Sequence, residues 1–180
     1  MNLRTILVVF TLSGMAVSAS SDNYEQADIY RDLRSQALGR DVETLKPRNG
    51  VFAVLMETGY DDAVVTVVAT ADGSASMYFS NGGGLIGAGE YDQVREVVFE
   101  SLSESEKYAN NLDATESYPL PGLGQTRFYV VTERGTLTAE APTDLLGNEK
   151  HELSPLFHQI HKLIAYMREA DEHRRSQRSE

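Results

Sequence analysis

The residues of this sequence that most resemble a chemical motif are glycines. Gly82, Gly84 and Gly87 have the spacing G-x-G-x-x-G, and they follow a predicted strand and precede a predicted helix. In dinucleotide-binding proteins, glycines at this spacing let the backbone approach a pyrophosphate, which sits at the N-terminus of the next helix. Taken alone, the motif predicts a phosphate-binding turn.

Two features of the surrounding residues argue against nucleotide binding. The motif belongs to a parallel β-α-β unit, but Asp72-Gly73 is typical of a tight hairpin, which makes the strand before the glycines antiparallel to its predecessor. The next helix opens with Glu90 and Asp92, and no Lys or Arg lies between Asp72 and Val94. Carboxylates at the start of a helix repel a phosphate. We therefore interpret the segment as a structural loop, or as a loop whose exposed backbone contacts a protein or another ligand.

Other side chains that could do chemistry lack the pattern that the chemistry requires. His158 and His161 are three residues apart on a predicted helix, whereas the helical zinc pair has histidines four apart and a third ligand. Glu57, Asp61 and Asp62 could supply paired carboxylates for hydrolysis, but acidic residues near turns usually serve turn chemistry. The sequence has no cysteine and no G-x-S-x-G nucleophile motif. We therefore predict no metal site and no cofactor, and we assign no catalytic residue.

The charge of the chain limits its partners. Its 180 residues carry a formal net charge of −11, and such an acidic surface opposes nucleic-acid binding, which requires a basic footprint. The same charge disfavours anionic lipid surfaces and favours cations or a basic protein partner. We therefore expect no nucleic-acid partner, name a basic protein as the candidate partner, and leave the oligomeric state open.

The N-terminal residues have the composition of a secretory signal. Arg4 supplies a positive region, residues 6–12 are almost entirely apolar, and small side chains precede a cleavage site after Ala19. The competing interpretation is a β-strand, because residues 5–10 have high strand propensity. We predict a signal peptide over residues 1–19 and hence a periplasmic or secreted protein. No later apolar run is long enough to span a bilayer, so we expect no membrane insertion after cleavage.

Residues 20–180 are expected to form a single α+β domain. Helices are predicted at residues 22–38, 91–108 and 154–173, and strands at residues 50–56, 63–70, 74–79, 126–132 and 136–140. The first two strands are apolar on both faces, which is typical of central strands covered on each side. The order α-β-β-β-α-β-β-α predicts a mostly antiparallel five-stranded sheet with packed helices. We expect residues 170–180 to fray.

The run from Tyr78 to Glu90, YFSNGGGLIGAGE, resembles a segment of a family of small uncharacterised bacterial proteins. The resemblance covers Val51 to Leu102. The family has no assigned activity, so the resemblance implies no catalytic residue, ligand or cofactor. It implies only that the glycine segment is a specific feature of the chain.

Two functions are compatible with these residues. The first is an exported, non-enzymatic binding protein, for example an immunity-type neutraliser of a basic secreted toxin or enzyme. The alternative is an exported hydrolase with an active site built from the glycine segment and the long loop at residues 110–125, since long loops are commonly functional. The candidate binding residues are Gly82, Gly83, Gly84, Leu85, Ile86 and Tyr118.

The glycines and the two aliphatic residues after them carry separate expectations. If the glycines let the chain turn, at least one of them needs a positive φ. Leu85 and Ile86 are adjacent and cannot easily both face one small core. An exposed member of this pair would be an anchor for a partner, and Tyr118 adds a second exposed interface candidate.

Overall fold

The computed structural model describes residues 24–39 and 45–178 of the chain. Its strands are β1 (Val51–Gly59), β2 (Val64–Thr70), β3 (Ala75–Phe79), β4 (Gly84–Ile86), β5 (Asp113–Thr115), β6 (Gln125–Thr132) and β7 (Gly135–Pro142). Its helices are α1 (Asp28–Leu38), α2 (Asp92–Glu106), α3 (Thr143–Gly147) and α4 (Ser154–Arg178), with the 3-10 helix η3 at Ala88–Glu90. The predicted signal peptide, residues 1–19, lies outside the described residues.

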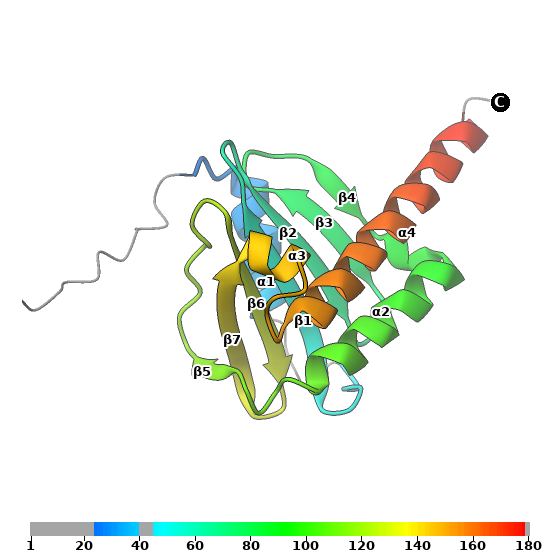
Figure 1. The fold of residues 1–180 in the computed structure, drawn as a ribbon. Helices are drawn as coiled ribbons and strands as arrows, with labels where there is room; N and C mark the ends of the chain where they lie inside the picture. The colour runs from blue at the N-terminus through cyan, green and yellow to red at the C-terminus, as the bar shows by residue number, and fades with distance from the viewer. Residues whose placement is uncertain (1–23, 40–44, 179–180) are drawn as a thin grey trace, which may run out of the picture.

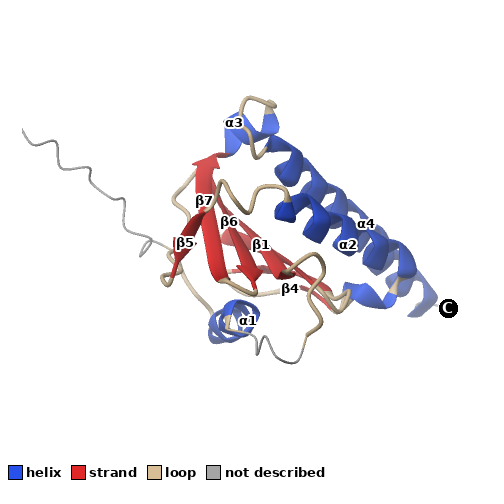
Figure 2. Cartoon of the chain, turned by 90° about the horizontal axis from the view of Figure 1, so that it is seen from below, coloured by secondary structure: helices blue, strands red, loops and turns tan. Residues whose placement is uncertain are grey.

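The strands form an antiparallel sheet with helices on both faces (Figures 1 and 2). The order across the sheet is β4-β3-β2-β1-β6-β7-β5, so β4 and β5 are its two edges. Helices α2 and α4 pack against each other over one face, and α1 lies on the opposite face (Figure 2). All nine residues of β1 are buried, because both of its faces are covered.

The predicted α+β class is confirmed, but the predicted five-stranded sheet and the element order are wrong. The described residues contain seven strands and four α-helices, in the order α-β-β-β-β-α-β-β-β-α-α. The two additional strands, β4 and β5, have three residues each, which is too short to display the two-residue alternation of a strand. The additional helix, α3, is a five-residue segment between the last predicted strand and the last predicted helix.

The alternation of side chains along the strands builds two separate cores. One core lies between the sheet and α2 and α4, and it includes Met56 of β1 and Met77 of β3. The other lies between the sheet and α1, and it includes Leu55 of β1 and Tyr78 of β3. Adjacent residues of a strand point to opposite faces, so β1, β2, β3 and β6 each contribute to both cores. We call these the α4 face and the α1 face of the sheet.

The glycine segment forms a turn, the edge strand β4 and η3. Gly82, Gly83 and Gly84 have φ values of 107°, 83° and 149°, which confirms that the segment depends on positive φ. The Gly82 N–H donates to the carbonyl of Phe79 at 3.0 Å, which closes the turn. Because β3 pairs antiparallel with both β2 and β4, the segment is not the parallel β-α-β turn of a dinucleotide-binding protein.

Candidate binding site

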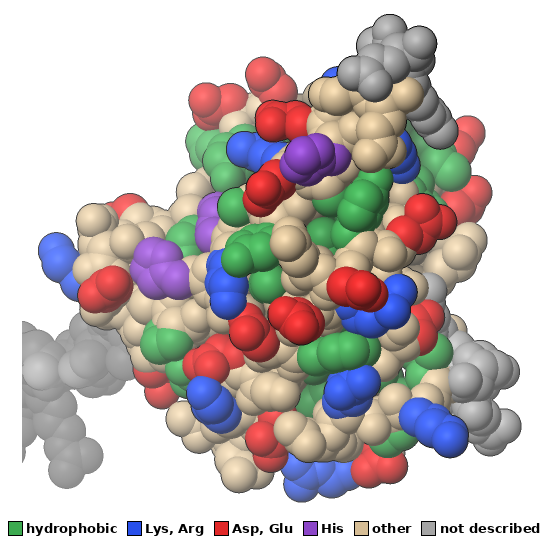
Figure 3. Space-filling view, turned by 90° about the vertical axis from the view of Figure 1, so that its right-hand side faces the viewer, with side chains coloured by type: hydrophobic (Ala, Val, Ile, Leu, Met, Phe, Trp, Pro, Cys, Tyr) green, Lys and Arg blue, Asp and Glu red, His purple; other side chains and the backbone are tan. Residues whose placement is uncertain are grey.

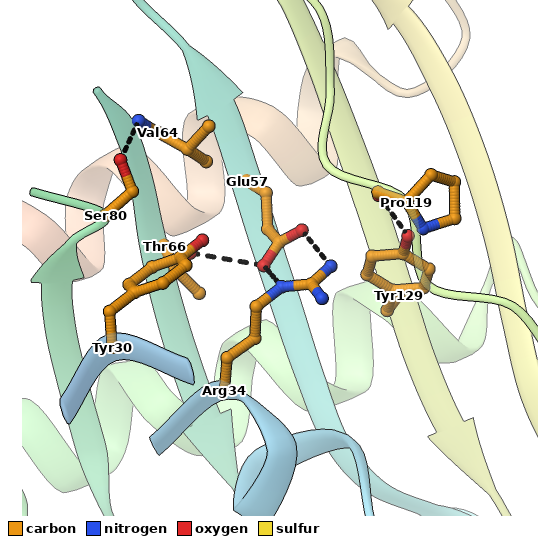
Figure 4. Close-up of polar contacts among 8 residues, drawn as sticks. All are labelled: Tyr30, Arg34, Glu57, Val64, Thr66, Ser80, Pro119 and Tyr129. Carbon is orange, nitrogen blue, oxygen red and sulfur yellow. Dashed lines mark hydrogen bonds and ion pairs between the residues drawn. The ribbon is translucent and has the colours of Figure 1, made fainter. Parts of the chain in front are cut away.

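A buried ion pair joins α1 to the centre of the sheet (Figure 4). Glu57 of β1 is fully buried and points toward α1. The Arg34 guanidinium of α1 donates from Nε to Glu57 Oε1 at 2.7 Å and from Nη2 to Oε2 at 2.8 Å. Paired bonds of this kind between a guanidinium and a carboxylate fix the orientation of both groups. The pair therefore holds α1 at one position on the sheet.

Hydroxyl groups extend this network on both sides (Figure 4). The Thr66 hydroxyl donates to Glu57 Oε1 at 3.2 Å, so the Tyr30 hydroxyl, 3.0 Å from the Thr66 oxygen, is the donor of that second bond. The Tyr129 hydroxyl donates to the carbonyl of Pro119 at 2.6 Å and ties the loop before β6 to that strand. Each buried hydroxyl here has a partner, as burial of a polar group requires.

Two tyrosines and the arginine of this network have pKa values well above neutral pH. Burial and the nearby Glu57 carboxylate raise the pKa of Tyr129 to about 12, and they also raise the pKa of Tyr30. Burial alone lowers the pKa of Arg34, but the hydrogen bonds and charge of Glu57 outweigh it and raise that pKa. Both tyrosines are therefore neutral and Arg34 is charged. A general acid or base works best with a pKa near the operating pH, so these three groups are suited to holding α1 and not to proton transfer.

Sequence reasoning missed this network. It grouped Glu57 with Asp61 and Asp62, but Glu57 is buried in β1 whereas the two aspartates are exposed in the next turn. The signal that could have found it is the presence of one carboxylate in a strand covered on both faces, because a buried charge needs a partner. Nothing in the spacing of the sequence identifies Arg34 as that partner.

The two aliphatic residues of β4 point to opposite faces of the sheet. Leu85 lies on the α4 face and packs against the larger core. Ile86 lies opposite Ser76 on the α1 face, and 54% of its surface is exposed. Among the described residues, no strand pairs with the outer side of β4. Ile86 is therefore an exposed aliphatic side chain on an open sheet edge.

A hollow lies on each face of the sheet beside β4. The α1-side hollow has a volume of about 220 Å³ and is lined by Leu33, Gln36, Ala37, Ser76, Tyr78 and Ile86, among others. The α4-side hollow has a volume of about 380 Å³, and its lining includes Met77, Phe79, Gly84, Leu85, Arg168 and Arg175. Neither lining includes Glu57, but the Arg34–Glu57 pair positions the helix that forms one wall of the α1-side hollow.

The end of α4 forms the outer wall of the second hollow. The last turns of α4 extend past the β4 edge and reach Arg178, beyond the predicted end near residue 173 (Figure 1). Asp171 pairs with Arg174 at 2.6 Å and with Arg175 at 2.7 Å, so these charges are mutually compensated. Figure 3 shows hydrophobic side chains exposed between charged ones on this side of the molecule.

The two edges of the sheet differ in charge. β5 begins with the exposed Asp113, and the exposed Glu116 follows it. Residues 82–89, which include β4, contain no charged side chain. Charged side chains on an edge strand oppose pairing with another chain. The β5 edge therefore has the usual protection, and the β4 edge lacks it.

Tyr118 lies away from the other candidate residues. Its ring contacts the ring of Tyr129 on β6 at a centroid distance of 5.6 Å, and its hydroxyl donates to Thr136 Oγ1 of β7 at 3.5 Å. Four strand-to-strand steps separate β6 from β4, or about 19 Å at about 4.8 Å per step. The structure therefore brings the glycine segment and Ile86 together but does not bring Tyr118 to them.

Comparison with known proteins does not identify the site, so its description rests on geometry. No protein-family model, curated protein or solved structure matches the chain. Within the residues that the structure describes, no group of three or more His, Cys, Asp or Glu side chains is placed to hold a metal ion. In the same residues, no helix is both long enough and apolar enough to cross a bilayer.

Proposed function

We propose that this protein is an exported, non-enzymatic binding protein that captures a basic protein partner at the β4 edge. The observation that carries the proposal is the exposed Ile86 on an uncharged edge strand, with a hollow on each face beside it. Isolated aliphatic side chains are common on protein surfaces. An exposed aliphatic side chain on an unprotected edge strand is different, because another chain can pair with that edge. Such an edge is a liability unless a partner covers it.

The charge of the chain supports a basic partner over a second copy of itself. Two copies at a formal net charge of −11 each repel one another at long range, whereas a basic protein is attracted. An acidic residue also lies near the site. Asp32 of α1 precedes Gln36 by one turn, on the helix stripe that reaches the α1-side hollow.

The hydrolase alternative has weaker support. Its active site required the glycine segment to meet the 110–125 loop. Tyr118 of that loop packs on β6, which is four strand-to-strand steps from β4, or about 19 Å at about 4.8 Å per step. The buried network around Arg34 holds its charges in a fixed ion pair. We therefore assign no catalytic residue and place the function in binding.

The first test compares the two sheet edges by partner capture. Ile86→Asp places a charge on the β4 edge, and Ala114→Asp places the same charge on the exposed middle residue of β5. Each protein is tagged, expressed in the producing cell and purified, and its bound proteins are quantified by mass spectrometry. We expect wild type and Ala114→Asp to retain the same basic protein, and Ile86→Asp to retain about thirtyfold less, the loss typical of an interface hot spot.

Melting curves control for unfolding in this experiment. Both substitutions are at exposed positions, where a change in the free energy of unfolding of about 0.5 kcal/mol or less is usual. Equal retention of the basic protein by Ile86→Asp and wild type would contradict the proposed interface. Loss of capture by Ala114→Asp alone would move the interface to β5.

Export is tested on protein isolated from the producing cell. If residues 1–19 are a signal peptide, N-terminal sequencing should begin at Ser20, because the peptidase cleaves after the small residue Ala19. Removal of this segment also removes one arginine and makes the mature charge −12, since −11 − 1 = −12. A mature protein that retains Met1 would overturn the compartment that we propose.

A further inference from the structure

We propose that the partner binds as an added strand, with its backbone paired to the outer side of β4 and its side chains alternating between the two hollows. The inference rests on the proposed binding function and specifies the chemistry of the partner. The partner segment is extended, places apolar side chains toward α4, and places apolar and basic side chains toward α1.

The first step of the argument concerns the backbone. In an edge strand, half of the N–H and C=O groups point away from the sheet and are available to another strand. β4 pairs with β3 on one side, and among the described residues its other side has no strand. Gly84 has no side chain, and Gly87, just after the strand, has open space around its Cβ position. A second backbone can therefore approach β4 closely.

The second step concerns the side chains of the added strand. Successive side chains of a strand point to opposite faces of the sheet. The sheet has a hollow on each face at this edge, of about 220 Å³ on the α1 side and about 380 Å³ on the α4 side. A cavity of about 150 Å³ accepts a benzene molecule, so each hollow has room for a large apolar side chain. A helix docked in one groove would fill only one of them.

The third step concerns the charges at the walls. On the α4 side, Met77, Phe79 and Leu85 form an apolar floor. The lining also includes two basic residues, Arg168 and Arg175, and two acidic residues, Asp171 and Glu172, and Arg175 is paired with Asp171, so this side favours an apolar side chain and gives a basic one no net attraction. On the α1 side, the stripe that includes Gln36 continues to the exposed Asp32, whereas Asp28, one turn further along, is already paired with Arg31. Lys or Arg on the α1-facing positions of the partner would meet the Asp32 carboxylate. The partner strand is therefore basic on one face and apolar on the other.

The α1 helix carries one further apolar residue along this path. Ile29 is 56% exposed and precedes Leu33 by four residues, so it lies one turn along the helix from a wall of the α1-side hollow. Gly82 lies near Ala27, which precedes α1, and its Cβ position is 3.9 Å from the Ala27 Cβ. Apolar side chains therefore lie from Ile86 along α1 to the glycine turn. A partner segment in an extended conformation could contact all of them.

The experiment uses short peptides as probes. One peptide alternates Val with Lys around a central Ile, and two derivatives carry N-methyl groups on the backbone amides of one edge or of the other. Binding of each labelled peptide to the mature protein is measured by fluorescence anisotropy. An added strand uses the amides of one edge only, so we expect one derivative to bind at least about tenfold more weakly and the other to bind like the parent.

Two protein variants place the binding at β4. Ile86→Asp should weaken the affinity for the parent peptide at least about tenfold. Ala114→Asp on the opposite edge should change that affinity less than about twofold. Amide resonances of residues 84–86 should shift when the peptide is added. These effects together identify pairing with β4 through the backbone.

Other outcomes overturn the inference without deciding the proposed function. Equal binding of both N-methylated peptides would show that no backbone pairing occurs, and failure of the parent peptide to bind would exclude this strand chemistry. Either result leaves the capture experiment with Ile86→Asp as the test of the interface itself. Sedimentation of the protein alone supplies a further check. A dimer that Ile86→Asp dissociates would make a second copy the occupant and would contradict the basic partner.

Discussion

Replacement of Glu57 by Gln is expected to lower the free energy of unfolding by about 3–5 kcal/mol, the usual cost of removing one partner from a buried ion pair. Glu57 is fully buried, and the side chain of Arg34 is only 14% exposed. With Gln at this position, the guanidinium stays charged in a poorly solvated place, loses its counter-charge, and keeps only one of its two acceptors, because the amide NH2 group cannot accept the second bond. Chemical denaturation followed by circular dichroism measures the effect.

A double-mutant cycle separates this loss from a simple change of packing. Arg34→Met alone leaves Glu57 as a buried charge without its guanidinium and should cost a similar amount. The double variant Arg34→Met and Glu57→Leu removes both charges, so its cost should be well below the sum of the two single costs. Strict additivity of the two costs, or a loss below about 1 kcal/mol for either single variant, would show that the pair does not hold α1.

Replacement of Gly84 by Ala is expected to cost about 3 kcal/mol, from overpacking and backbone strain that each contribute about 1–3 kcal/mol. Gly84 has a φ of 149°, and a Cβ there would overlap the carbonyl oxygen of Met77 and lie 2.7 Å from the Cα of Tyr78. These are backbone atoms of the paired strand β3, so they cannot rotate away. The substitution should therefore detach β4 from β3.

Gly83→Ala is the matched control for this substitution. Gly83 also has a positive φ, of 83°, but no atom lies within 4 Å of its Cβ position. Only the left-handed strain remains, at about 1–2 kcal/mol. In thermal melts, the melting temperature of Gly84→Ala should be well below that of Gly83→Ala. Equal melting temperatures would mean that the tight approach of β4 to β3 does not contribute to stability.

The sequence predicted those parts of the fold that have long, regular patterns. The apolar runs of β1 and β2 identified strands that are covered on both faces. Leu85 and Ile86 are adjacent, so when Leu85 faces the core, Ile86 must point to the other face. β4 and β5 escaped prediction because three residues do not establish a period. A glycine at the start of β4 also argues against a strand by propensity alone.

The parts of the site that depend on distant contacts could not be predicted. Arg34 and Glu57 are 23 positions apart, and no local spacing links them. The separation of Tyr118 from Ile86 follows from the order of the strands, in which β6 lies next to β1, and β2 and β3 lie between β1 and β4. The hollows beside β4 depend likewise on where α1 and the end of α4 lie. Sequence reasoning thus anticipated that one of Leu85 and Ile86 is exposed, but not the walls around it.

Hydrogen–deuterium exchange of the captured complex tests the central claim most directly. The amides of residues 82–89 are compared in the free protein and in the complex, with β5 as the internal reference. Backbone pairing at an edge protects its amides, so the account predicts slower exchange at β4 in the complex and no change at β5. Unchanged exchange across residues 82–89, with protection elsewhere on the chain, would contradict the β4 edge as the binding site.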